Sequence, residues 1–186
     1  MRLPNPLPVF HTARLTLRQP EPRDVAARLA MGRDPDIYRM FGADVSSLAP
    51  FTQAQAEAWV ARIDEHPAAW IIARDDDAIG EIRIENPVDA DARASLAIGI
   101  LDRRHLGQGY GVEAIRAVAA FAFDALGLHR LSVRVLAFNE RAIRAYEKVG
   151  FRREGIERES AHIGGEWRDD VLMGLLSREL IRAAAR

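Results

Sequence analysis

The chain has 186 residues, a length that suits one compact domain with a sizeable core. Hydrophobic residues make up 48% and charged residues 28%, and the formal net charge of −1 gives no electrostatic reason to expect nucleic-acid or anionic-membrane binding. The absence of cysteine excludes disulfides, a cysteine nucleophile and thiolate metal sites, and no apolar run is long enough to span a bilayer. We therefore expect a single cytoplasmic domain over residues 1–186.

The first third of the chain predicts one strand and three helices. Residues 1–12 should form an irregular arm, because three prolines block regular hydrogen bonding. Alternating polar and apolar residues at 14–18 predict a half-buried strand. Helices are expected after Pro22, with Val25, Leu29 and Met31 on the buried side, after residues 34–35, and from Thr52 to about residue 67.

The remainder of the chain predicts a sheet with two further helices. Residues 69–73 and 78–84 flank a turn and indicate a hairpin, and residues 94–101 form the next strand. An amphipathic helix begins at about residue 112, with one apolar stripe consisting of Val112, Ile115, Ala119, Ala122 and Leu126. A buried strand at 129–136, a helix from Asn139 to Gly150, strands at 151–158 and 167–176 and a short charged helix complete the chain. This order gives an α/β (α+β) domain.

A glycine-rich turn links the strand at 94–101 to the helix that follows. Residues 104–111 read Arg-His-Leu-Gly-Gln-Gly-Tyr-Gly. Unpaired backbone N–H groups at a helix N-terminus bind phosphate, and glycines let the anion approach the backbone closely. Arg104 could add a planar fork of donors. The turn therefore predicts a site for a phosphorylated ligand.

The glycine spacing separates this turn from two other phosphate-binding motifs. No Gly-Lys-Ser/Thr follows it, as a P-loop would require, and the glycines are not spaced as in the dinucleotide fingerprint. A dinucleotide-binding oxidoreductase is therefore disfavoured. A glycine-rich turn with no ligand stays open as the alternative.

A second motif makes a family resemblance visible. Arg104-x-x-Gly107-x-Gly109 is followed by residues 139–151, Asn-x-x-Ala-x-x-x-Tyr-Glu-Lys-x-Gly-Phe. Together they resemble the GCN5-related N-acetyltransferases (GNAT), and in particular the group typified by the ribosomal-protein N-acetyltransferases RimJ and RimL. The flanking segments at 12–18 and 165–176 agree, so the resemblance covers about residues 12–179.

The resemblance implies a fold and a cofactor site. The fold would be a single GNAT domain, with a mixed, mostly antiparallel sheet of about seven strands, flanked by helices and splayed between the fourth strand (94–101) and the fifth (129–136). Acetyl-CoA would be the co-substrate, with no metal, and its pantetheine arm would lie in the splay. The residues implied to bind it are Ile98, Ile100, Arg104, Leu106, Gly107, Gln108, Gly109, Tyr110, Gly111, Asn139, Ala142 and Tyr146. Asn139 could equally act as a helix N-cap, and the two roles are compatible.

The same resemblance implies acetyl transfer to a primary amine by direct attack through a ternary complex. A phenol near the thioester sulfur can protonate the departing thiolate, so Tyr146 is the candidate general acid, with a packed core aromatic as the alternative. Many relatives carry a base on the strand at 94–101, which has no acid here. Glu81 on the neighbouring strand is the preferred substitute, beside Glu85 or deprotonation through water by backbone carbonyls.

The acceptor is not indicated by any pattern in the sequence. A protein N-terminal α-amine and a small-molecule amine both fit, and monomer and homodimer stay open. None of the five histidines forms a metal-ligand pattern. The alternative function is a non-catalytic acyl-CoA-binding regulatory domain that has kept the cofactor site.

Overall fold

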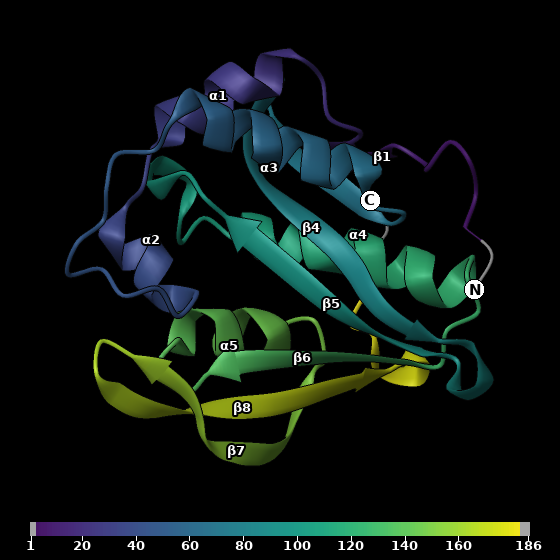
Figure 1. Ribbon diagram of the computed structural model, residues 1–186. Helices are drawn as coiled ribbons and strands as arrows, with labels where there is room; N and C mark the ends of the chain where they lie inside the picture. Colours follow the sequence, from purple (N-terminus) through teal and green to yellow (C-terminus); the bar gives the residue numbers. More distant parts are fainter. Residues whose placement is uncertain (1–2, 183–186) are drawn as a thin grey trace.

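The computed structural model describes residues 3–182, and its centre is one sheet of eight strands (Figure 1). The strand order is β1-β2-β3-β4-β5-β6-β8-β7. Every neighbouring pair is antiparallel except β5 and β6, which run parallel. The prediction of a mixed, mostly antiparallel sheet with flanking helices is confirmed. The strands are β1 (Phe10–His11), β2 (Thr16–Arg18), β3 (Ala69–Arg74), β4 (Asp77–Val88), β5 (Arg93–Ile100), β6 (Arg130–Leu136), β7 (Arg152–Ile163) and β8 (Glu166–Leu176).

Helices cover both faces of this sheet. The helices are α1 (Arg23–Met31), α2 (Pro35–Met40), α3 (Gln53–Glu65), α4 (Tyr110–Asp124) and α5 (Glu140–Glu147). The described residues also contain three short 3-10 turns, η1 (Asp89–Asp91), η2 (Arg103–His105) and η3 (Ser177–Glu179). In Figure 1, α1 and α3 lie in front of the first strands, α4 lies behind β4 and β5, and α5 is seen through the opening between β5 and β6. No helix within residues 3–182 is long and apolar enough to cross a membrane.

The extra strand, β1, lies in the segment expected to be an irregular arm. The prolines end at Pro8, whose carbonyl accepts a hydrogen bond from Trp70 Nε1 at 2.8 Å. Phe10 then packs against Trp70 and Phe121, with ring centroids 5.5 and 5.3 Å apart, and pairs with Leu17. Aromatic packing therefore holds this short strand in place despite the prolines before it.

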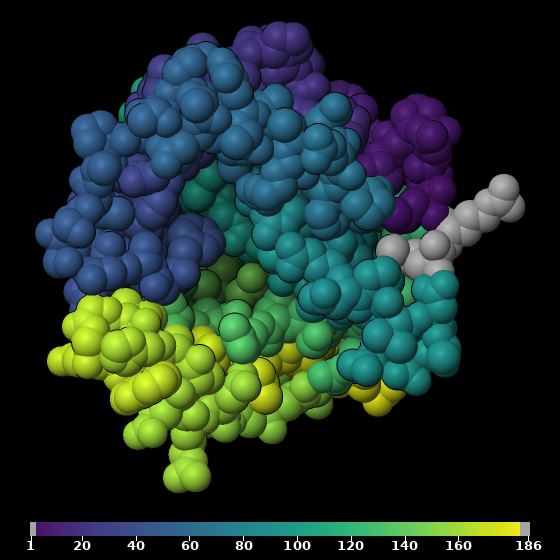
Figure 2. Space-filling model, viewed as in Figure 1, coloured from purple at the N-terminus to yellow at the C-terminus, as the bar shows by residue number. Residues whose placement is uncertain are grey.

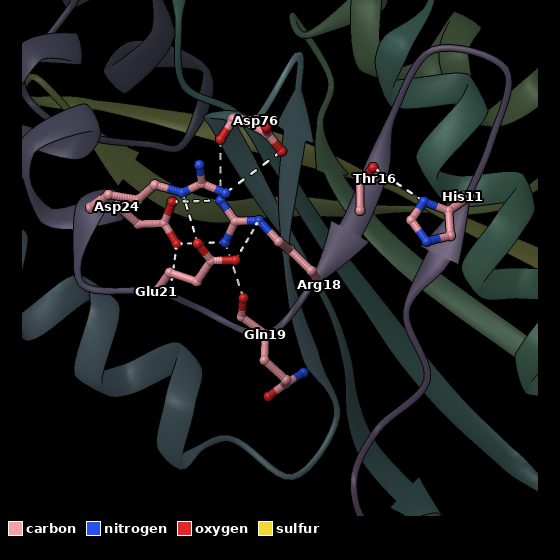
Figure 3. Close-up of polar contacts among 8 residues, drawn as sticks. His11, Thr16, Arg18, Gln19, Glu21, Asp24 and Asp76 are labelled. Carbon is pink, nitrogen blue, oxygen red and sulfur yellow. Dashed lines mark hydrogen bonds and ion pairs between the residues drawn. The ribbon is translucent and has the colours of Figure 1, made fainter.

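Helix α1 differs from the prediction in what it buries. Val25, Leu29 and Met31 are only partly buried, whereas Asp24 and Arg28 are 1% and 3% exposed. Asp24 forms a bidentate pair with Arg18 of β2, with N–O distances of 2.7 and 2.9 Å. Figure 3 shows this pair beside Glu21 and the turn residue Asp76. A paired charge takes the place that the helical spacing assigned to apolar side chains.

The stripe predicted for the central helix is confirmed, and it forms part of the main core. Ile115, Ala119 and Ala122 of α4 are at most 1% exposed and pack on the rear face of the sheet. This helix carries the glycine turn at its N-terminus. The core therefore fixes the position and direction of the predicted phosphate site.

The splay between β5 and β6 is also confirmed. These strands pair only where residues 93–95 face residues 130–132. Beyond Ser95 each strand stays paired with its outer neighbour, β4 or β8, and the two strands separate. The opening leaves the facing backbone edges of both strands without a partner strand.

The C-terminal strands are longer than predicted, and the final helix is shorter. β7 extends to Ile163 and β8 begins at Glu166, so the pair forms one long hairpin. After β8 the described residues contain a 3-10 turn, Ser177–Glu179, in place of the expected helix. Any part of that helix predicted for residues 183–186 lies outside the described range.

Candidate functional site

The glycine turn has the geometry of an anion site. Gly107 and Gly109 have φ values of +74° and +82°, in the left-handed region that favours glycine, and α4 begins at Tyr110. In the described part of the chain, the backbone N–H groups of residues 107–111 donate to no acceptor. They lie at the positive end of α4, where an anion is stabilised.

Two predicted residues of the turn are engaged elsewhere in this structure. The guanidinium of Arg104 pairs with Asp102, with Nη2 and Oδ2 2.7 Å apart, and the Arg104 side chain is 82% exposed. This pair holds the pKa of Asp102 below its usual range. The N–H of Leu106 donates to the carbonyl of Arg103 at 3.2 Å. A phosphate on the turn would thus meet backbone groups of 107–111 first.

A cavity of about 230 Å³ lies between the turn, the start of α4 and α5. Every residue predicted to bind the cofactor lines it, except Arg104 and Gln108. The structure therefore brings the two sequence motifs, which are some thirty residues apart, to one cleft behind the sheet. We call this the rear cavity.

The rear cavity carries positive charge that the sequence analysis did not note. Arg141, Arg144 and Lys148 of α5 line it, and no aspartate or glutamate does. Arg144 pairs with Glu140 at 2.6 Å. Spacings of three and four residues place all three cations on one helix face, a signal that the sequence does contain.

Asn139 joins α5 to α2. Its Oδ1 accepts from the N–H of Ala142 at 3.2 Å, which confirms the N-cap, and its Nδ2 donates to the carbonyl of Met40 at 3.3 Å. The side chain is buried and lines the rear cavity. A ligand in the cleft would compete with Met40 for the Asn139 amide.

Tyr146 lies at the inner end of the rear cavity. Its ring is 7% exposed and packs edge-on against Phe151, with centroids 5.2 Å apart. Burial raises the pKa of this phenol well above its ordinary value. Among the described residues its hydroxyl has no hydrogen-bond partner. The site therefore holds a protonated phenol whose donor is free.

A second, larger cavity of about 750 Å³ opens on the front of the sheet. Figure 2 shows this front cavity as a hollow between α2 and α3 above and the β7–β8 hairpin below. Its acidic lining residues are Glu85, Glu154 and Asp170, and its basic ones are Arg130 and Arg134. Glu154 is paired with Arg130, while Asp170 accepts from Ser160 at 2.9 Å and lies 3.3 Å from Arg134.

The two cavities meet in the opening between β5 and β6. The residues that line both are Met40, Phe41, Ile98, Asn139, Ala142 and Tyr146. A ligand entering from the rear and another entering from the front would therefore meet beside the Tyr146 hydroxyl.

Glu81, the predicted base, lies on the front face but lines neither cavity. Its carboxylate accepts from Arg62 at 2.8 and 3.0 Å and is also paired with Arg83. Glu85 does line the front cavity and accepts from Arg83 Nε at 2.8 Å. Within residues 3–182, no cluster of three or more His, Cys, Asp or Glu side chains could hold a metal ion.

The sequence predicts helix α2, after residues 34–35, but does not show that the helix borders both cavities. Asp34, its N-cap, pairs with Arg103 at 2.9 Å, and its C-terminal end is tied to Asn139. Met40 and the exposed Phe41 line both cavities. This six-residue helix has no distinctive motif, and only the tertiary contacts show its position.

A solved structure described as "Crystal structure of putative acetyltransferase" shares this fold, with a TM-score of 0.77 and 26% identity over 96% of this chain and 90% of that one. The family model of the GNAT acetyltransferase domain matches residues 14–152. The chain belongs to this family and is an N-acetyltransferase of the GNAT fold.

Individual relatives agree with this assignment. The "Probable N-acetyltransferase YjcK" of Bacillus subtilis is 30% identical over 159 residues, covering 86% of this chain and 84% of that protein. Mycobacterium smegmatis RimJ, solved in complex with CoA-disulfide, matches with a TM-score of 0.78 and 22% identity over 98% of this chain and 94% of that one. Spermidine N-acetyltransferase from Vibrio cholerae, in complex with CoA and spermine, has a TM-score of 0.73 and 22% identity over 90% and 98%. The last two share the fold.

Proposed function

We propose that this protein transfers an acetyl group from acetyl-CoA to a primary amine by direct attack in a ternary complex. The observation that carries the proposal is the meeting of the rear and front cavities at Ile98, Asn139, Ala142 and Tyr146. Holding both reactants at one point replaces a bimolecular encounter with an oriented one.

The rear cavity would hold the donor. The pyrophosphate would bind the free N–H groups of residues 107–111, and the pantetheine arm would follow the edge of β5 that carries Ile98 and Ile100. An unpaired N–H of that edge could bind the thioester oxygen as negative charge develops on it. RimJ and the Vibrio cholerae spermidine N-acetyltransferase, which share this fold, were solved with CoA-disulfide and with CoA, and this supports a CoA thioester as the donor.

Tyr146 would act as the general acid. The amine lone pair attacks the thioester carbon, the tetrahedral intermediate collapses, and the carbon–sulfur bond breaks. The departing thiolate takes the phenolic proton, and the new amide nitrogen loses one proton to a base. Because burial keeps the phenol protonated, the donor is available at neutral pH.

The amine proton would leave through the water of the front cavity. Glu81 stays the prediction from sequence, but it lines neither cavity and its carboxylate is paired with two arginines. Glu85 lines the cavity and accepts from one arginine only. We therefore propose that the proton passes through water to Glu85, with Glu81 orienting Arg83.

A matched pair of variants tests this assignment. Glu85→Gln should lower kcat by roughly 10²-fold near pH 7 and recover at high pH, where more of the amine is already neutral. Glu81→Gln should lower kcat less and keep the wild-type pH profile. The opposite ranking would return the base to Glu81, and two unchanged variants would favour backbone carbonyls acting through water.

The acceptor class is either a protein N-terminal α-amine or a small amine such as a polyamine. The front cavity has a volume of about 750 Å³, and its three acidic and two arginine lining residues leave a small excess of negative charge that suits a cationic ligand. Thiol release from acetyl-CoA should be measured with N-terminal peptides, polyamines and aminoglycosides. Turnover with one class identifies the acceptor. Acetyl-CoA binding without turnover on the whole panel would instead favour a non-catalytic acyl-CoA-binding domain.

A further inference from the structure

We propose that one end of the front cavity, lined by Phe41 and its apolar neighbours, binds an acyl chain longer than acetyl. The donor could then be a propionyl or butyryl thioester of CoA. The inference rests on the proposed function and deepens it, because it concerns the group that is transferred. A donor held in the rear cavity would bring its acyl group to the junction of the two cavities, so the side chains at that junction are the ones that the acyl group meets.

Phe41 gives the junction an exposed apolar surface. Its side chain is 56% exposed and lines both cavities, together with Met40 and Ile98. A single exposed apolar side chain needs no explanation, but these three lie together at the point where the donor would end. Covering such a surface with methylene groups of a ligand is favourable, and an acetyl group offers only one methyl. The surface therefore suits a longer chain.

The phenyl ring of Phe41 is held in place by the end of α2 and by a strand. The carbonyl of Met40 accepts from the Asn139 side chain at 3.3 Å, and the N–H of Phe41 donates to the carbonyl of Tyr38 at 3.0 Å. The ring lies against β5, with its Cζ 3.0 Å from the position that a Cβ on Gly99 would take. A surface that is already ordered loses little entropy when a ligand binds to it.

The apolar surface continues from α2 to the other side of the opening. A Cβ on Gly42 would lie 3.6 Å from Ile163 of β7 and 3.8 Å from Leu136 of β6, and both of these side chains line the front cavity. At Leu136 the strands β5 and β6 are no longer paired, and Figure 1 shows α2 beside this wide end of the opening. We call Met40, Phe41, Ile98, Leu136 and Ile163 the apolar end of the front cavity.

The opposite end of the front cavity is polar. It lies where β5 and β6 still pair, and its lining includes Glu85, Asn86, Ser95, Arg130 and Glu154. A cationic or neutral amine is better solvated among these groups than against Phe41 and Leu136. The amine would therefore approach from the polar end, which leaves the apolar end for the acyl chain.

One acidic side chain that lines the front cavity lies near the apolar end. Asp170 faces Leu136 across the β6–β8 pair, accepts from Ser160 at 2.9 Å and lies 3.3 Å from Arg134. Because its carboxylate already has these partners, an uncharged chain beside it leaves no new polar group unsatisfied.

The length of the acyl chain can be varied without knowledge of the acceptor. The dissociation constants of acetyl-CoA, propionyl-CoA and butyryl-CoA are measured by calorimetry, with no amine present, on the wild type, Phe41→Ala, Phe41→Leu and Trp167→Ala. Trp167 is the matched control, because it is an aromatic side chain that is 61% exposed and lines neither cavity. In the wild type, butyryl-CoA should bind about fivefold to fifteenfold more tightly than acetyl-CoA, with propionyl-CoA between them.

In Phe41→Ala the preference for butyryl-CoA should fall below about threefold, because the surface that the chain covers is lost. Phe41→Leu should keep most of the preference, and Trp167→Ala should keep all of it. Butyryl-CoA binding no tighter than acetyl-CoA in the wild type, a preference that survives in Phe41→Ala, or an equal loss in Trp167→Ala would overturn the acyl-chain site and leave the proposed function intact. Failure of the folded wild type to bind any of the three thioesters would overturn both.

Discussion

The hydroxyl of Tyr146 belongs to a packed ring that also lines both cavities. It has no hydrogen-bond partner in the described structure, and its ring is buried against Phe151. Among the described residues, the hydroxyl oxygen is not one of the fully buried side-chain atoms that lack a partner, and Tyr146 lines both cavities. This position suits the proposed role of Tyr146 as proton donor to the thiolate.

Replacing this group gives the most direct prediction for a single atom. Tyr146→Phe should lower kcat by about 10²- to 10⁴-fold, because the proton donor to the thiolate is lost. The dissociation constant of acetyl-CoA should change less than about twofold, since the ring remains. Steady-state kinetics and calorimetry check the two expectations. An unchanged kcat would remove Tyr146 from the mechanism.

The pH dependence of kcat supplies the control for the role of Tyr146. Burial raises the pKa of Tyr146 above its ordinary value of about 10, so the phenol stays protonated up to and beyond that pH. The wild-type kcat should therefore show no falling limb up to about pH 10. A limb centred near pH 8 or 9 that disappears in Tyr146→Phe would contradict the effect of burial.

At the scale of elements, the glycine turn depends on backbone conformation more than on side chains. Gly109 is the N-cap of α4 at φ +82°, and Gly164, in the turn between β7 and β8, has φ +57°. An added Cβ would meet Arg14 at 3.5 Å in the first case and nothing within 4 Å in the second. An alanine would therefore be strained at both positions, but only Gly109 lies at the predicted phosphate site.

Alanine substitutions at these two glycines should separate an effect on protein stability from an effect on CoA binding. Gly109→Ala and Gly164→Ala should each cost about 1–2 kcal/mol of stability. Only Gly109→Ala should weaken CoA binding, by roughly tenfold, because it moves the N–H groups of the turn. Thermal unfolding and calorimetry measure both effects. Equal CoA affinity in the two variants would show that the turn does not hold the pyrophosphate.

The link between β2 and α1 gives a prediction for folding. Arg18 and Asp24 are 7% and 1% exposed, so Arg18→Met leaves a buried carboxylate without its partner. The free energy of unfolding should fall by about 3–5 kcal/mol, and adding Asp24→Asn should recover part of the loss. Arg23→Met, in which a half-exposed pair is removed, should change it by under about 1 kcal/mol. A small effect of Arg18→Met in denaturant unfolding would contradict this account.

Helices and strands could be predicted from the sequence where the local periodicity of apolar residues agrees with the tertiary packing. The apolar stripe of α4 and the glycine turn were visible because the same residues set the helix and bury it. The burial of Asp24 and the strand at Phe10 could not be predicted in this way. Asp24 is buried by its pairing with Arg18, six residues earlier on a different element, and Phe10 packs against Trp70 and Phe121, which are distant in sequence. Apolar periodicity shows neither a paired charge between two elements nor an aromatic cluster formed by distant segments.

The candidate site, like the fold, could be predicted from the sequence only in part. Motif spacing identified the rear cavity, including Asn139 and Ala142, because a turn and a helix cap each have local signatures. The front cavity is built from single residues of α2, β4, β6 and the β7–β8 hairpin. No spacing relates these residues, so the positions of α2 and Glu85 at the front cavity could not be derived from the sequence, although the helix itself and Glu85 as a candidate base were predicted.

At the scale of the whole molecule, the meeting of the two cavities predicts the kinetic mechanism. Under the proposed direct attack both ligands are bound before transfer, so double-reciprocal plots of velocity at several fixed amine concentrations should intersect. Parallel lines would indicate a covalent acetyl-enzyme, for which the chain offers no cysteine. Product formation from acetyl-CoA and the identified amine supplies the measurement.

Helix α2 also limits how this protein can be engineered or can diverge. It is anchored to Arg103 beside the glycine turn and to Asn139 in the cleft, while Met40 and Phe41 border both cavities. A change in α2 selected for a new amine will therefore alter donor affinity at the same time. Changes on the β7–β8 hairpin, at positions such as His162, border the front cavity alone. New acceptor preferences should evolve more readily through the hairpin than through α2.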